Sequence, residues 1–140
     1  ESADGWIPAG MEVERLGGLV KQLRELAAKA GRDPATIAIA PQFIGYLGKS
    51  HEATVARMKQ SQMYKHLMSL RKSTLKNQVG LAMEDINLVC STEAVVEKAL
   101  KLKAAGVTHF LGLYFAASSV QELLDQMQMF AEEVTPKLVA

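Results

Sequence analysis

The side chains best suited to bond-making chemistry, three histidines and one cysteine, are scattered along the sequence. His51, His66 and His109 share no spacing typical of two ligands of one metal ion, and there is no cysteine pair, so we expect no metal site. Cys90 precedes a predicted helix N-terminus, which stabilises a thiolate, but no histidine lies near it in sequence to act as a base. The sequence also has no glycine-rich dinucleotide motif and no phosphate-binding loop with lysine. It therefore identifies no catalytic residue.

The most basic stretch, RKSTLKNQ, starts at Arg71 and contains no aromatic residue. This stretch fits a solvated helix end or loop, or alternatively a segment that binds a phosphate group. The formal net charge is only +1, with both signs interspersed, so nucleic-acid binding is not indicated. A single cysteine fits a reducing compartment, and no apolar run reaches the roughly 18 residues of a membrane helix. No charged-then-apolar leader is seen, and we expect a cytoplasmic protein without membrane contact.

The elements that would position these side chains alternate along the chain. Apolar, partly β-branched runs at residues 3–8, 36–47 and 107–115 each precede a helix-period segment. We expect helices over residues 11–30, 51–70 and 92–105, with loop-like residues 71–87 before the third. Ser91 would cap that third helix and Gly106 would end it, and Ser118 or Ser119 would cap a last helix. Alternating strands and helices, with strands apolar on both faces, predict an α/β fold with a parallel sheet, in one segment over residues 1–140.

Three parallel strands are too few to form an independent sheet of this kind. The first and last strands would be edges with unpaired backbone groups, and the helices would cover only part of the apolar surface. The pattern therefore predicts that another copy, or a missing part of the sheet, completes the core.

Four segments taken in order resemble one family. They are SADGWIP, AAKAGRDP, STEAVVEKALKLKAAGVTHFLGLYF and VQELLDQMQMFAEEVTPKL, and together with the residues between them they span nearly the whole chain. This order resembles the C-terminal part of the bacterial luciferase-like monooxygenases, which include flavin-dependent oxygenases and deazaflavin-dependent reductases. One departure is CSTE at residues 90–93, where the family more often has a glycine, a threonine or serine, and a proline before the glutamate.

The resemblance implies a (β/α)8 barrel of which this chain holds the C-terminal three βα units, strands six to eight. A whole barrel needs about 250 residues, so the first five units, which carry most of the family's flavin contacts and catalytic residues, would lie upstream of residue 1. The implied cofactor of the intact enzyme is FMN or a deazaflavin (coenzyme F420), and this chain alone would bind it poorly or not at all.

Barrel enzymes hold their sites at the C-terminal ends of the strands and in the loops that follow, which implies five cofactor-binding candidates. Trp6 would lie against the flavin ring, or else be a core residue under the following loop. Gln42 would point its amide at the ligand or into solvent, Phe43 follows it, and Tyr114 ends the last strand. Arg71 would touch a phosphate group, or lie at a solvated helix end.

Pro41 bears on the Gln42 candidate, because proline cannot donate a ladder hydrogen bond. We expect regular pairing to end there, leaving Gln42 just beyond the strand.

Two functions follow from these observations. The first is the C-terminal part of a luciferase-like flavin- or deazaflavin-dependent oxidoreductase, inactive on its own and completed by the N-terminal half of the barrel. The alternative is a non-catalytic assembly or ligand-binding module that forms homo-oligomers through its open sheet edges.

Overall fold

The computed structural model describes residues 3–139. The helices are, in chain order, α1 (Val13–Lys29), α2 (His51–Gln60), α3 (Gln62–Leu70), α4 (Thr92–Ala104), α5 (Val120–Met129), a π-helical turn (Phe130–Val134) and α6 (Thr135–Val139). Short 3-10 turns occupy Pro34–Thr36 and Lys76–Gln78. The strands are β1 (Gly5–Trp6), β2 (Ala38–Ile39), β3 (Gln42–Gly48), β4 (Leu88–Ser91) and β5 (Gly112–Phe115).

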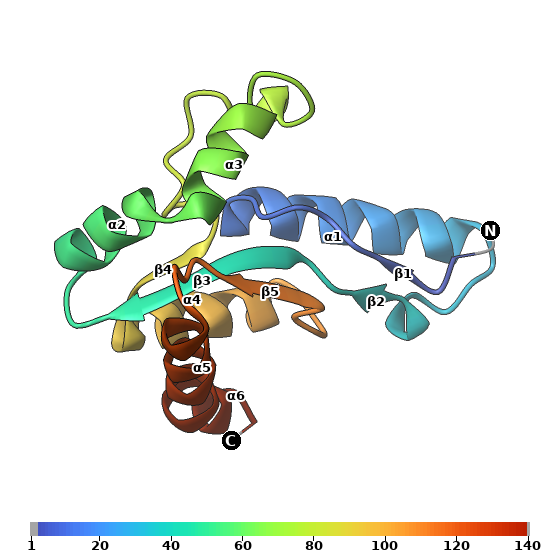
Figure 1. Cartoon of the computed structure of the whole chain (residues 1–140). Coiled ribbons are helices and arrows are strands. Elements are labelled where there is room, and N and C mark those ends of the chain that lie inside the picture. Colours follow the sequence, from blue (N-terminus) through green and yellow to red (C-terminus); the bar gives the residue numbers. More distant parts are fainter. Residues whose placement is uncertain (1–2, 140) are drawn as a thin grey trace.

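All pairings between these strands are parallel, and β2 and β3 together form the central line of the sheet (Figure 1). β5 pairs with β3 along one side. On the other side β1 pairs with β2, an isolated bridge joins Ala9 to Gln42, and β4 then pairs with the second half of β3. The observed fold is therefore α/β with a parallel sheet, as the alternating pattern predicts.

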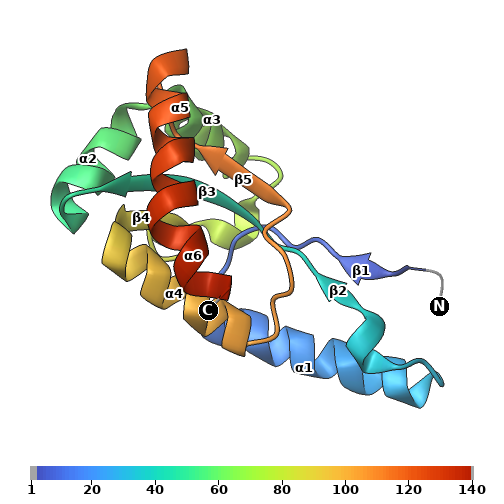
Figure 2. The same cartoon turned by 90° about the horizontal axis from the view of Figure 1, so that it is seen from below.

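Side-chain alternation along the central line divides the core in two. Ile39, Phe43 and Leu47 belong to a buried cluster with residues of α1, α4 and the π-helical turn. Ile44 and Tyr46 belong to a second cluster, with residues of α2 and partly buried residues of α3. Helices thus lie on both faces of β3, and Figure 2 shows α4 lying between α1 and α6.

The central strand corrects the expectation that pairing ends at Pro41. The backbone N–H of Gln42 donates to the Pro8 carbonyl oxygen, and β3 then continues for seven residues. Pro41 only separates β2 from β3. On the edge opposite β5, the neighbouring strand changes near this point from β1 to β4. Gln42 is the first residue of a strand and not a residue beyond one.

β4 lies outside the three predicted strands, immediately after the segment expected to be a loop. It is only four residues long and runs directly into α4, so its apolar residues resemble the start of that helix.

The predicted helix over residues 51–70 is divided into two helices, α2 and α3. Ser61 has extended backbone, ends α2, and accepts a hydrogen bond from the Tyr64 N–H, which begins α3.

The predicted strand over residues 107–115 forms only over its last four residues. The backbone N–H groups of Thr108 and His109 both donate to the Ile39 carbonyl oxygen, so no regular ladder forms there. Three predicted ends are confirmed: Ser91 and Ser119 cap α4 and α5, and Gly106 follows α4 with a positive φ of 100°.

Candidate functional site

A cavity of about 370 Å³ lies between the sheet and α3, on the face of β3 opposite α1. Gln42, Ile44 and Tyr114 line it from the strands, and His66 lines it from α3. Its other lining residues are Ala9, Gly10, Phe43, Met63, Leu67, Leu70, Leu75, Gln78, Met83 and Asn87. The lining is mostly apolar with a few polar groups, which is the composition of small-molecule sites.

Gly112 explains why two of the predicted residues reach this cavity together. It pairs with Gln42 in the register of β3 and β5, and Tyr114 pairs with Ile44 on the same face. A Cβ atom on Gly112 would lie 2.9 Å from Tyr114 Cε2 and 3.0 Å from Gln42 Cγ. The bare glycine therefore leaves room for both side chains over one point of the sheet.

The polar side chains of the cavity divide into engaged and available groups. Asn87 accepts a hydrogen bond from the Ile44 N–H (2.8 Å) and donates one to the Met83 carbonyl (2.9 Å), and Gln78 donates to the Gly10 carbonyl (3.2 Å). The Gln42 amide, the Tyr114 hydroxyl and the His66 ring make no hydrogen bond within residues 3–139, and all three residues are exposed. These three side chains are available to a ligand.

The remaining three predicted residues do not join them. The Phe43 side chain is only 1% exposed and its ring meets Phe110 edge-on in the core on the other face, so Phe43 offers the cavity mainly its backbone. The Arg71 guanidinium donates to the Leu81 carbonyl oxygen (2.7 Å) and holds the loop after α3. Arg71 does not line the cavity.

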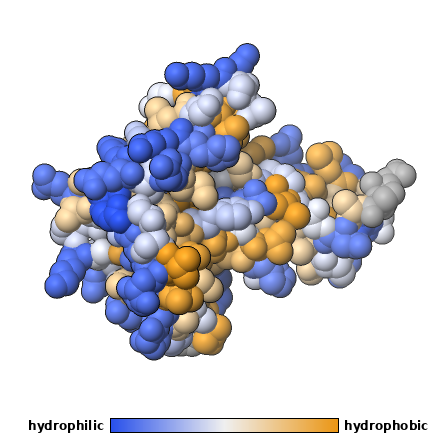
Figure 3. Space-filling view, in the orientation of Figure 1, coloured by the Kyte–Doolittle hydropathy of each residue, from blue (hydrophilic) through white to orange (hydrophobic). Residues whose placement is uncertain are grey.

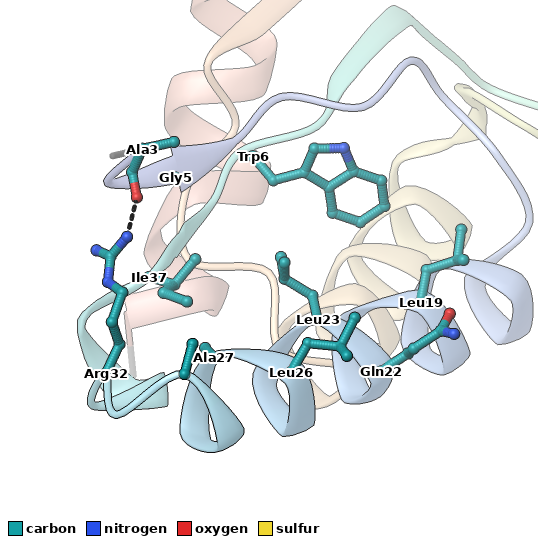
Figure 4. Close-up of a pocket in the computed structure, with 11 residues that line it drawn as sticks. Ala3, Gly5, Trp6, Leu19, Gln22, Leu23, Leu26, Ala27, Arg32 and Ile37 are labelled. Atoms are coloured by element: carbon teal, nitrogen blue, oxygen red, sulfur yellow. Dashed lines mark hydrogen bonds between the residues drawn. The ribbon is translucent and has the colours of Figure 1, made fainter. Parts of the chain in front are cut away.

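Trp6 lines a different cavity, of about 550 Å³, between β1 and α1 (Figure 4). It pairs with Ile39, so its side chain lies on the face of the sheet that α1 covers. Figure 4 shows the indole above Leu23 of α1. Trp6 therefore lies on the opposite face of the sheet from Gln42 and Tyr114, in the arrangement expected of a core residue at an open edge.

A charged cluster ties the C-terminal end of β3 to α2 and α5. Glu122 accepts hydrogen bonds from the Tyr46 hydroxyl (2.7 Å), from Arg57 (2.7 Å) and from the Ser118 N–H (2.6 Å). Burial, followed by the bond to Glu122, raises the pKa of Tyr46 to about 12. Burial acts to raise the pKa of Glu122, but the bonds from Ser118 and Tyr46 and the charge of Arg57 outweigh it and lower that pKa.

The fold brings Cys90 within reach of a histidine that the sequence does not suggest. His51 Nδ1 lies 3.3 Å from Cys90 Sγ, although 39 residues separate them, because β4 pairs beside the end of β3 where α2 begins. Nearby, Lys98 donates to the carbonyl oxygens of Glu84 and Asn87, and burial lowers its pKa. Within residues 3–139 no three metal-ligating side chains come together, and no helix is long and apolar enough to cross a membrane.

The sequence profile of the luciferase-like monooxygenase family matches residues 1–134, nearly the whole chain. The chain belongs to the luciferase-like monooxygenase family. No curated protein matches its sequence.

Solved structures of similar fold agree with this membership. An F420-dependent secondary alcohol dehydrogenase, in complex with an F420-acetone adduct, superposes with a TM-score of 0.70 at 15% identity and covers 97% of this chain. A coenzyme F420-dependent tetrahydromethanopterin reductase from Methanopyrus kandleri gives 0.65 at 18% identity, covering 99%. The oxygenating constituent of 3,6-diketocamphane monooxygenase from Pseudomonas putida, in complex with FMN, gives 0.63 at 15% identity, covering 94%.

This luciferase-like chain spans less than half the length of those three structures, at 43%, 46% and 42% of their chains respectively. At these identities the likeness shows the fold alone.

Proposed function

We propose that this chain is the C-terminal three βα units of a luciferase-like (β/α)8 barrel, and that it forms one wall of the cofactor pocket of a flavin- or deazaflavin-dependent oxidoreductase. The observation that carries the proposal is that the Gln42 and Tyr114 side chains lie close together over Gly112, inside an apolar cavity on one face of the sheet. Family membership and the shorter span of this chain relative to solved structures support it.

The lining of this cavity fits a flat heteroaromatic ring. Ile44, Met63 and Leu67 provide apolar surface, and the exposed Gln42 amide can both donate to and accept from the polar edge of a ring. The Tyr114 side chain adds an aromatic face with a hydroxyl at its tip. No lysine or arginine lines the cavity, so a phosphate group would find no permanently charged partner among its lining residues. The residues here fit the ring of FMN or F420 better than its phosphate.

The cofactor and the residues of this chain would have different roles. A bound flavin or deazaflavin supplies the redox chemistry of the enzyme. The residues of this chain orient the ring through the Gln42 amide, and exclude water from one side of it through the apolar surface under α3. Because these residues form only one wall of the pocket, we propose that the chain alone is inactive.

Titrating the chain with riboflavin, FMN and F420 tests the ring-binding wall, with ligand fluorescence as the readout. We expect weak binding, with similar affinity for riboflavin and FMN because no lysine or arginine lines the cavity to bind the phosphate. Gln42→Ala and Tyr114→Ala should each weaken it by about tenfold. Gln60→Ala is the matched control and should leave binding unchanged, because this exposed glutamine ends α2 and does not line the cavity.

Binding that survives both cavity variants, or no binding of any of the three ligands at concentrations that saturate a ring site, contradicts the proposal. In that event the alternative function gains support, a non-catalytic module that assembles through its sheet edges. The observation that favours this alternative is exposed apolar surface at both edges, where Ile7 is 54% and Leu111 is 61% exposed.

A further inference from the structure

We propose that two copies of this chain associate head to tail, with the β5–α5 unit of one copy docking on the β1–α1 edge of the next. The inference rests on the alternative function given above, assembly through the sheet edges, and takes the two open ends of the sheet as surfaces that a second copy covers. Each end combines an unpaired strand edge with an apolar helix face, and the two ends have complementary positions in the fold.

The strand edges are the first part of the argument. The carbonyl oxygens of Asp4, Trp6 and Pro8 accept hydrogen bonds from the central line of the sheet. In a parallel ladder the intervening residues, Gly5 and Ile7, point their backbone groups to the opposite side. β1 pairs only with β2 among the described strands, and β5 only with β3. Both ends of the sheet therefore present backbone groups to a further parallel strand.

The groove beside β1 is the second part. α1 buries Leu16, Val20 and Ala27 against the sheet, and a second stripe of the same helix lines the cavity under Trp6. That stripe consists of Leu19, Leu23 and Leu26, spaced as neighbours along one helix face. Leu26 is 56% exposed, so part of this apolar surface has no cover in a single copy.

The surface that fits this groove lies at the other end of the chain. Val120, Leu124 and Met127 have the same spacing along α5 as the groove stripe has along α1, and they are 74%, 51% and 49% exposed. Figure 3 shows apolar side chains gathered in patches on the face seen in Figure 1. Patches of this kind, which polar residues leave uncovered, mark protein interaction sites.

The handedness of strand–helix–strand connections determines how the α5 stripe and the α1 groove would meet. Strand–helix–strand connections in a parallel sheet are right-handed, so consecutive units place their helices on the same face. The helices after β5 pack on the same core cluster as α1, through Phe130 and Val134. A strand that continued this order would pair parallel with β5 at its open edge. β1 of a second copy is such a strand, and docking it brings α5 beside α1 at the groove.

The exposed area is of the size that this contact requires. The chain exposes 8165 Å², whereas a compact monomer of 15.2 kDa exposes about 7,100 Å². The excess, about 1,000 Å², is close to the area that one partner buries in a stable interface, about 800 Å². Because the contact joins two different surfaces, it either closes a ring of copies or continues to larger assemblies.

Light scattering coupled to gel filtration, over a range of protein concentration, tests the proposal. We expect the wild-type mass to exceed one copy. Leu26→Lys, in the groove, and Leu124→Lys, in the α5 stripe, should each weaken association by about tenfold or more, because docking would bury the lysine charge. Both leucines are exposed in one copy, so circular dichroism should show that both variants fold. Leu100→Lys, an exposed leucine on α4 away from both edges, is the matched control.

Mixing the two edge variants distinguishes this contact from a symmetric one. The Leu26→Lys copy keeps an intact α5 stripe and the Leu124→Lys copy keeps an intact groove, so the mixture should recover dimers held by one contact. A wild-type chain that stays at the mass of one copy overturns the proposal, as expected if the edges are covered only by another part of a longer protein. An assembly that neither edge variant disperses, or whose variants fail to complement, overturns it equally.

Discussion

Tyr46 shows how one side chain joins three elements of this fold. Its hydroxyl donates to Glu122 of α5, and Glu122 also binds Arg57 of α2. Replacing Glu122 by glutamine removes the negative charge but not the burial, so the pKa of Tyr46 should fall from about 12 and remain above 10.0. Tyrosinate absorbance across an alkaline titration measures this change, and Tyr46→Phe assigns the midpoint. An unchanged midpoint in Glu122→Gln would show that burial alone sets the value.

The same group links stability to pH. The pKa of Tyr46 in the folded chain, about 12, lies above its ordinary value of 10.0. Its contribution to the free energy of unfolding is therefore fully present below pH 10 and is lost as the pH rises through 12. Urea titrations in that alkaline range should show a steeper loss of stability for wild type than for Tyr46→Phe.

At the scale of residues, the sequence predicts contacts along one strand better than contacts between distant segments. Tyr114 lies near the C-terminal end of β5, where the barrel rule places it, whereas Gln42 was expected just beyond a strand and is instead the first residue of β3. The pairing of His51 with Cys90 depends on the register of β4, which has no signal of its own. Trp6 could be placed on its strand, but which face it occupies depends on the pairing of β1 with β2.

At the scale of elements, Gln126 of α5 substitutes for a missing strand partner. Its amide accepts from the Leu47 N–H (2.7 Å) and donates to the Leu47 carbonyl (2.9 Å), all in the buried core. Gln126→Leu leaves both backbone groups of Leu47 without partners and should destabilise the chain by about 3 kcal/mol in urea unfolding. Gln128→Leu, where the exposed amide binds only Glu132, should cost less than about 0.5 kcal/mol. Equal losses in both variants would contradict this role of Gln126.

Two glycines give opposite expectations for the same substitution. Gly18 lies within α1, and a Cβ atom added to it would meet no other atom within 4 Å, so Gly18→Ala should stabilise the chain by about 0.5–1 kcal/mol through helix propensity. A Cβ atom on Gly10 would overlap the Ile86 backbone carbonyl, so Gly10→Ala should destabilise it by more than about 2 kcal/mol. Thermal unfolding of both variants measures the difference, and a stabilising Gly10→Ala would show that this segment moves freely.

Element types were predictable where a helix has a periodic apolar face and a polar cap. Ser91 and Ser119 begin the helices that they are predicted to begin. β4 was not, because a strand of four residues has too few alternating positions to establish a period. Ser61 ends α2 through its backbone conformation, while the apolar spacing on either side of it continues as if one helix ran through.

At the scale of the whole molecule, an apolar composition and a small number of strands predict that the folded chain exposes apolar surface. The two open ends leave large apolar side chains exposed, among them Ile7, Leu111 and Val120. A dilute solution of the chain should therefore enhance the fluorescence of the hydrophobic dye ANS, while near-UV circular dichroism shows fixed packing in the same sample. Enhancement with lost near-UV signal would instead indicate a loosely packed state.

The dependence of dye fluorescence on protein concentration distinguishes a folded chain with exposed sheet ends from a loosely packed one. If association covers the two ends, dye fluorescence per chain should fall as the protein concentration rises, because fewer ends remain open. Leu124→Lys, which blocks docking, should keep the dye signal per chain nearly constant over the same range. A wild-type chain that unfolds cooperatively and binds no dye at any concentration would show that its sheet edges are closed within one copy. That result would contradict the open edges of β1, which pairs only with β2 among the described strands, and of β5, which pairs only with β3.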